Sequence, residues 1–154
     1  MAKSATSADA ALILKLYNLR REPEMRKARN WFTSEFWPDS ADDYIKIANS
    51  PASPENAWLR QVGSYWDMAA AFVLHGALNE DLFVQPGCSG EMFFIFGKIY
   101  PFLKELRQKT NNPTAWSNIE GVATGSKAAR KRLELTMANL EKRKQSLGKT
   151  AKKS

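Results

Sequence analysis

Apolar residues recur at intervals of three and four along almost the whole chain, which is the spacing of one face of an α-helix. The N-terminal part holds two such groups: Ile13, Leu16 and Tyr17, and then Met25, Ala28, Phe32 and Phe36. Pro23 lies between the groups, and proline is favoured in the first turn of a helix. The pattern therefore predicts two helices here, or one helix bent sharply at the proline.

The centre of the chain carries the two widest apolar stripes. The first lies on a helix predicted from Glu55 to Leu74, and its members are Trp58, Val62, Tyr65, Trp66, Ala69, Phe72 and Val73. The second begins at Ser89, runs to Thr110 and contains Met92, Ile95, Phe96, Ile99, Phe102, Leu103 and Leu106. A short connection joins the stripes, so we expect antiparallel packing. Pro101 presses on the carbonyl of Gly97, which predicts a kink there.

Shorter elements flank these stripes. Ser40 with Asp43 predicts a capped helix to Ala48, Asn79 predicts a capped turn through Phe83, and a short helix is expected from Trp116 to Ala123. The last helix is predicted from Ser126 to about Gln145, with a narrow seam of Leu133, Leu140 and Leu147 and with Met137 between them. The fold class is therefore all-α: a single-domain antiparallel helical bundle with two long central helices and shorter flanking helices.

Charge is concentrated in the last segment. Residues 126–153 hold ten Lys or Arg and two Glu, so the net charge is +8 there and −1 in residues 1–125. We therefore divide the chain into a helical bundle domain, 1–125, and a basic C-terminal helix with a disordered tail, 126–154. The candidate contacts for anions or phosphates all lie in this tail: Lys127, Arg130, Lys131, Arg132, Lys142, Arg143 and Lys144.

Composition excludes several classes of protein. The apolar stretches are too short to span a bilayer, and the polar N-terminus lacks the apolar segment of a signal peptide. Cys88 is the single cysteine, which excludes an internal disulfide and a zinc site made of several thiolates, so a cytoplasmic location is expected. No metal or cofactor site is predicted, because the lone His75 offers no metal-binding spacing. Gly121–Lys127 resembles a phosphate-binding loop only superficially, since its spacing is wrong.

Three residues are candidates for chemistry. Asp67 and His75 form a candidate polar site: Asp67 lies among core positions that can raise a carboxyl pKa, and His75 ends an apolar stripe. The structural alternatives rank higher, namely an Asp that faces solvent or binds an Arg such as Arg60, and a His at a helix C-terminus. Cys88 near a helix start suits a reactive thiolate, but no base lies within reach in sequence.

A basic group near the N-terminus has three interpretations. Its members are Arg20, Arg21, Arg26, Lys27 and Arg29. The first interpretation is a solvated surface neutralised by Glu22 and Glu24, and the second is an Arg buried against a carboxylate such as Asp67 or Glu105. An anion site ranks third.

Four short stretches carry a resemblance to a known family. They are Leu16–Arg20, Pro23–Arg29, Val73–Leu82 and Ile99–Arg107. Together they resemble a bacterial all-helical family known only as a domain of unknown function, over roughly Leu12 to Ala123. The resemblance implies a small helical module without an assigned activity, in some relatives attached to membrane helices. It raises the expectation for the fold and leaves the function open.

Several functions therefore stand in order. The first is a non-enzymatic interaction or scaffold module that binds a protein partner or self-associates, through the Leu133–Leu147 seam or an exposed aromatic face. The second is non-specific binding of nucleic acid or of an anionic membrane by the basic tail. The third is a small-ligand pocket or enzyme, with a cavity beside Tyr65, Trp66, Phe96 and Tyr100.

Overall fold

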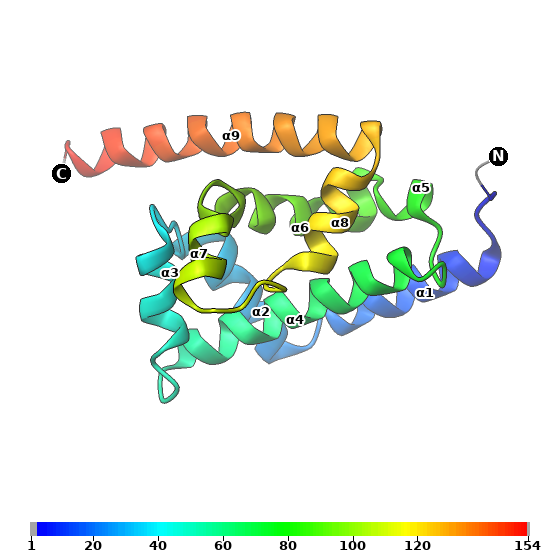
Figure 1. Cartoon of the computed structure of the whole chain (residues 1–154), viewed down its shortest axis with the longest axis horizontal. Coiled ribbons are helices and arrows are strands. Elements are labelled where there is room, and N and C mark those ends of the chain that lie inside the picture. Colours follow the sequence, from blue (N-terminus) through cyan, green and yellow to red (C-terminus); the bar gives the residue numbers. More distant parts are fainter. Residues whose placement is uncertain (1–2, 154) are drawn as a thin grey trace.

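Helices make up most of the computed structural model, which describes residues 3–153 (Figure 1). No strand occurs among the residues described, and the predicted all-α class is confirmed. The elements in chain order are α1 (Ser7–Leu19), α2 (Pro23–Asn30), the π-helical turn η1 (Trp31–Glu35), α3 (Ala41–Ala48), α4 (Pro54–Leu74), α5 (Glu80–Phe83), α6 (Pro86–Ile99), the 3₁₀ turn η2 (Tyr100–Phe102), α7 (Leu103–Lys109), α8 (Ser117–Gly125) and α9 (Lys127–Ala151).

The caps that the sequence predicted are present. Ser40 accepts a hydrogen bond from the Asp43 amide at 3.4 Å, and Asn79 accepts one from the Leu82 amide at 2.8 Å. Ser126 does the same for Ala129 at 3.1 Å and so begins α9. Each side-chain oxygen satisfies an amide that the first helical turn leaves without a backbone partner. Local polar residues therefore set these helix starts.

The N-terminal pattern forms two helices and a π-helical turn. α1 and α2 are separate, and Pro23 is the first residue of α2, where its missing amide costs no hydrogen bond. After α2 the chain widens into the π-turn, which brings three aromatic rings together. The Trp31 ring stacks on Phe36 at 4.7 Å between centroids, and Phe32 meets Phe36 edge-on at 5.4 Å.

The two central stripes run in opposite directions, as predicted, but they are not each other's nearest helices (Figure 1). α4 packs mainly on α2 and α8, while α6 packs mainly on α9. α8 contributes the buried side chains of Ile119, Val122 and Ala123. The expected direct pairing of α4 with α6 is therefore corrected: α8 packs on both and reaches α9 as well.

The second stripe is broken at Pro101 rather than kinked. α6 ends at Ile99, η2 makes a tight 3₁₀ turn, and α7 starts at Leu103. The turn carries Phe102 and Leu103 into the core, where both are buried. The proline cannot supply the amide that a continuous helix needs, so the chain changes direction there.

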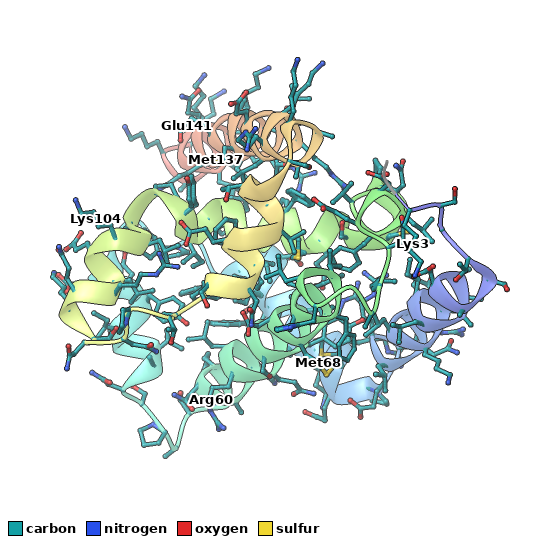
Figure 2. All side chains as sticks on the ribbon, turned by 45° about the vertical axis from the view of Figure 1, so that its right-hand side comes forward. Lys3, Arg60, Met68, Lys104, Met137 and Glu141 are labelled. Atoms are coloured by element: carbon teal, nitrogen blue, oxygen red, sulfur yellow. The ribbon has the colours of Figure 1, made fainter. Side chains whose placement is uncertain are left out.

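Gly97 serves the packing of α9 rather than the break. A Cβ at this position would lie 2.7 Å from Leu140 Cδ1 and 3.4 Å from Met137 Cγ. Figure 2 places Met137 on α9, above the helices of the bundle. Real Cβ atoms do not come within 2.7 Å of a methyl carbon, so the bare backbone of Gly97 lets α9 approach α6 closely.

The basic segment is part of the bundle over its first half. Ala129 and Leu133 belong to the same buried core as the rest of the chain, and Leu140 is also buried. The division after residue 125 therefore does not separate two cores. α9 also continues to Ala151, beyond the predicted end near Gln145, and Lys152 follows in a turn.

The last turns of α9 extend past the helices beneath them (Figure 1). Every described residue after Leu140 is exposed, and Leu147 is 51% exposed although it continues the leucine seam. The prediction that this seam mediates self-association is corrected for Leu133 and Leu140, because the body of the same chain already covers them.

Substitution of Gly97 by Val should lower the free energy of unfolding by about 1–3 kcal/mol, because the larger side chain forces Leu140 and Met137 to move. Urea unfolding measures the change. Gly87→Val is the matched control, since nothing lies within 4 Å of a Cβ at Gly87 in the same helix. Adding Leu140→Ala should recover part of the loss caused by Gly97→Val. An equal effect of the two glycine variants would contradict the close approach of α9.

Deletion of residues 126–154 should destabilise the fold by more than about 3 kcal/mol, because it uncovers the face of α6 on which Leu133 and Leu140 pack. Deletion of residues 146–154 alone should leave the urea midpoint almost unchanged, since those residues are exposed. If the longer deletion proves as stable as the full chain, α9 is an appendage after all.

Candidate functional site

A buried ion pair joins α2 and α6. The Arg29 guanidinium donates from Nε and from a terminal nitrogen to Glu91 Oε2, each at 2.7 Å. Trp66 of α4 donates its indole N–H to Glu91 Oε1 at 3.1 Å, and Arg29 also donates to the Arg20 carbonyl at 3.2 Å. A carboxylate that is largely removed from water is stable only when its charge and lone pairs are satisfied in this way. The network therefore fixes three helices in one arrangement.

The second interpretation of the N-terminal basic group holds for Arg29, with Glu91 as its partner in place of Asp67 or Glu105. Arg20 is also buried, and its guanidinium lies over the Tyr17 and Trp66 rings at 5.0 and 5.2 Å. Lys27 forms an exposed ion pair with Glu24 at 2.7 Å. Arg20 and Arg29 are thus committed to the core and do not offer an anion site.

Lys98 on α6 is the most deeply placed lysine in the part of the chain that the structure describes. Its ammonium donates to the carbonyls of Phe32, Thr33 and Phe36 at 2.7, 3.0 and 2.9 Å. These carbonyls end the π-turn, where the helical ladder leaves acceptors unpaired. The ammonium also lies 3.8 Å from the Trp37 ring centroid. Lys98 therefore caps a helix end from another helix, and all three of its donors are used.

Burial, with a smaller contribution from Arg143, lowers the pKa of Lys98 to about 7. Desolvation penalises the charged form, whereas the three carbonyls favour it. A cavity of about 180 Å³ lies beside this side chain, between Trp37, Pro101 and Met137. Because the amine is bonded on three sides, its role here is structural.

Asp67 and His75 are not brought together. Asp67 is partly buried on α4 and accepts a hydrogen bond from the Asn118 side chain of α8 at 2.8 Å. His75 caps the C-terminal end of the same helix and is exposed. Eight residues of helix separate their backbones by about 12 Å. Asp67 instead lines a cleft of about 350 Å³ that also contains Arg60 and Trp116.

The aromatic residues that the third functional hypothesis placed around a cavity belong to the core, except for Tyr100, which is exposed. Tyr65 and Trp66 meet edge-on at 5.0 Å, and Phe96 lies 5.2 Å from Tyr100. The Tyr65 hydroxyl donates to the Leu16 carbonyl at 2.5 Å, and burial raises the pKa of Tyr65 to about 12. The larger cavities line other surfaces.

Cys88 is half-buried in the first turns of α6. In the described residues, no group of three or more His, Cys, Asp or Glu is arranged to hold a metal ion. The stretch Gly121–Lys127 forms the end of α8 and the start of α9.

The structure sorts the seven predicted anion contacts of α9 into two sets. Arg130 donates to the Thr124 carbonyl at 2.6 Å, Arg132 and Arg143 lie over the Phe93 and Phe94 rings at 4.5 and 5.4 Å, and Lys144 pairs with Asp39. Those four side chains face the body. Lys127, Lys131 and Lys142 are exposed, with no ion pair in the part of the chain described.

The sequence did not single out Lys149, which completes a row with Lys131 and Lys142. These three lysines are eleven and seven residues apart, so they point to the same side of a straight helix. The side opposite to them is the one that Leu133 and Leu140 bury. Leu135 lies in the same outward row and is 60% exposed. The periodicity of the charged residues, read against the leucine seam, was the signal that could have identified this row.

Residues 5–126 match the family described as a domain of unknown function, DUF4760, and the chain belongs to this family. The match ends where α9 begins, so the basic helix lies outside it. No curated protein and no solved structure matches the chain. Among the described residues, no helix is both long enough and apolar enough to cross a bilayer.

The lowered pKa of Lys98 predicts a pH dependence of stability. Between pH 7 and 10.5 the unfolded chain holds more protons on this lysine than the folded chain, so the free energy of unfolding should rise with pH in that window. The difference between the wild type and Lys98→Met should therefore grow from pH 7 to pH 10, measured by urea unfolding. Lys104→Met, which removes an exposed lysine, should give a flat difference. A flat difference for Lys98→Met as well would contradict the assignment.

Proposed function

We propose that this protein is a non-enzymatic interaction module whose α9 helix docks on an anionic lipid surface. The observation that carries the proposal is the outward row of Lys131, Leu135, Lys142 and Lys149 on a helix whose other side is held by the body. A helix fixed in this way presents its cations together.

The difference between the arginines and the lysines of α9 supports this partner. Arg130, Arg132 and Arg143 are occupied by a carbonyl and by two phenylalanine rings. The exposed cations of the row are all lysines, which act as point charges on flexible stems rather than as planar, two-pronged donors. Lysines suit a diffuse negative surface, where each contributes about 1 kcal/mol.

Leu135 favours a lipid surface over a nucleic acid. Its exposed apolar side chain lies between lysines that can extend toward headgroups, and burial of a leucine at the bilayer boundary is favourable. The same side chain adds nothing to contacts with phosphates. α9 also has no aromatic residue on which a base can stack.

A non-enzymatic role agrees with the arrangement of the candidate groups. Asp67 and His75 lie on different parts of α4, and His75 has no side-chain hydrogen bond within the described chain. General acid–base chemistry requires a positioned partner for the reacting proton.

The test is cosedimentation with vesicles of phosphatidylcholine, with and without about a third phosphatidylglycerol. The wild type should bind only the anionic vesicles, and moderate salt should weaken binding. The triple variant Lys131→Gln, Lys142→Gln, Lys149→Gln should lose about a hundredfold in affinity, which is the effect of three such charges.

The matched control is Lys15→Gln, Lys46→Gln, Lys104→Gln, which removes three exposed lysines from α1, α3 and α7. It should retain binding, because it changes the net charge equally but leaves α9 intact. Leu135→Gln should weaken vesicle binding and leave any duplex DNA binding unchanged. Equal losses in the two triple variants, or a stronger and leucine-independent affinity for DNA, would refute the lipid assignment.

A further inference from the structure

The cleft that contains Asp67 carries charges of opposite sign at its two ends. It lies between α3, α4 and the segment that leads into α8, and its volume is about 350 Å³. α4 supplies Arg60 and Asp67, and Figure 2 shows Arg60 at the surface near the start of that helix. Seven residues separate the two, so they share one face of α4, with about 10 Å between their backbones.

Arg60 is oriented by a buried amide. Asn56 Oδ1 accepts a hydrogen bond from Arg60 Nε at 2.9 Å, and the Asn56 side-chain nitrogen donates to the carbonyls of Ile47 and Ala48 at 3.0 and 2.8 Å. The amide is thus locked between α3 and α4. The two terminal nitrogens of Arg60 have no partner within the described chain, and together they present the planar fork that binds a carboxylate.

Asp67 is held in a similar way at the other end. The Asn118 side chain donates to Asp67 Oδ2 at 2.8 Å, which fixes the carboxylate from α8. The second oxygen, Oδ1, accepts no hydrogen bond from the described residues. A carboxylate with a free oxygen at the edge of a cleft suits an ammonium or another cationic donor.

An aromatic wall connects the two ends. Trp116 lies in the left-handed backbone region, with φ of 62°, which is costly for a bulky side chain. Its indole N–H donates to the Tyr44 hydroxyl at 3.1 Å, and its ring would lie 3.7 Å from a Cβ on Gly63. Gly63 lies on α4 between Arg60 and Asp67. The floor there is bare backbone and the wall is an indole, which together favour an apolar chain.

We infer that this cleft binds a linear zwitterion, with an anionic group on Arg60, a cationic group on Asp67 and an apolar linker along Trp116 and Gly63. A dianion would be repelled by Asp67 and a dication by Arg60. An uncharged aromatic ligand would leave both charges without partners. The site is independent of α9 and of lipid binding.

The probe is 6-aminohexanoate, titrated into the ¹⁵N-labelled full chain and followed by amide NMR shifts. We expect saturable shifts at Arg60, Gly63, Asp67 and Trp116. Hexanoate and hexylamine each lack one charge and should bind at least tenfold more weakly, because each leaves one end of the cleft unpaired. Glycine, in which the two charges are adjacent, cannot span the two ends and should also bind weakly.

Arg60→Gln and Asp67→Asn preserve the approximate size of each side chain and remove its charge. Each should weaken 6-aminohexanoate binding about tenfold or more. Arg21→Gln and Asp81→Asn are the matched controls, since both residues are exposed outside the cleft. Thermal unfolding establishes that all four variants remain folded.

Two results would overturn the inference. One is the absence of saturable shifts with 6-aminohexanoate over the millimolar range. The other is binding that Arg60→Gln and Asp67→Asn leave unchanged while both proteins stay folded. A preference for hexanoate or for hexylamine over the zwitterion would equally contradict the pairing of two charges.

Discussion

Two charged side chains on one face of α6 hold the N-terminal third of the chain in place. Glu91 binds Arg29 in the last turn of α2, and Lys98, seven residues later, binds the carbonyls that follow that helix. A carboxylate thus meets a cation and an ammonium meets a helix end, so both contacts have favourable charge. Because both groups are removed from water, a shifted register would leave a charge unpaired at considerable cost. The positions of α2, of the π-turn and of its aromatic rings follow from this constraint.

The other side of α6 is shaped by an absence of side chain. Gly97 lies next to Lys98 in sequence and faces α9, where Leu140 and Met137 occupy the space that a Cβ would take. One helix therefore uses charge toward α2 and close packing toward α9. The family match covers α6 but ends before α9, so this interface joins a family segment to a helix outside it.

Local signals in the sequence were sufficient for the helix starts and for the all-α class. Ser40, Asn79 and Ser126 cap helices as their short-range patterns indicate, and Pro23 begins α2. The break at Pro101 was underestimated, because the sequence shows the missing amide but not the core that draws Phe102 inward. The long-range partners were also beyond the sequence. Nothing near Lys98 in the chain indicates three carbonyls from residues more than sixty positions earlier.

The same distinction applies to the candidate sites. Asp67 was identified correctly as a partly buried carboxylate, but its pairing with His75 was wrong, because one helix separates the two. Its neighbours in the cleft come from α3 and α8, and their approach depends on the left-handed backbone of Trp116, which is rare for tryptophan. The charge of the last segment was evident from composition. Which of its cations are free became evident only when the phenylalanine rings beneath Arg132 and Arg143 were located.

The overhang of α9 has a thermodynamic consequence of its own. Beyond Leu140 every described residue is exposed, so the terminal turns are maintained chiefly by their own backbone hydrogen bonds. A helical end of this kind exists in a local helix–coil equilibrium, with each added turn only slightly favourable. Amide exchange should therefore become progressively faster from Leu140 toward Ala151 while the rest of the bundle stays protected. Anything that binds this end reduces its conformational entropy, and part of the binding free energy is spent on that ordering.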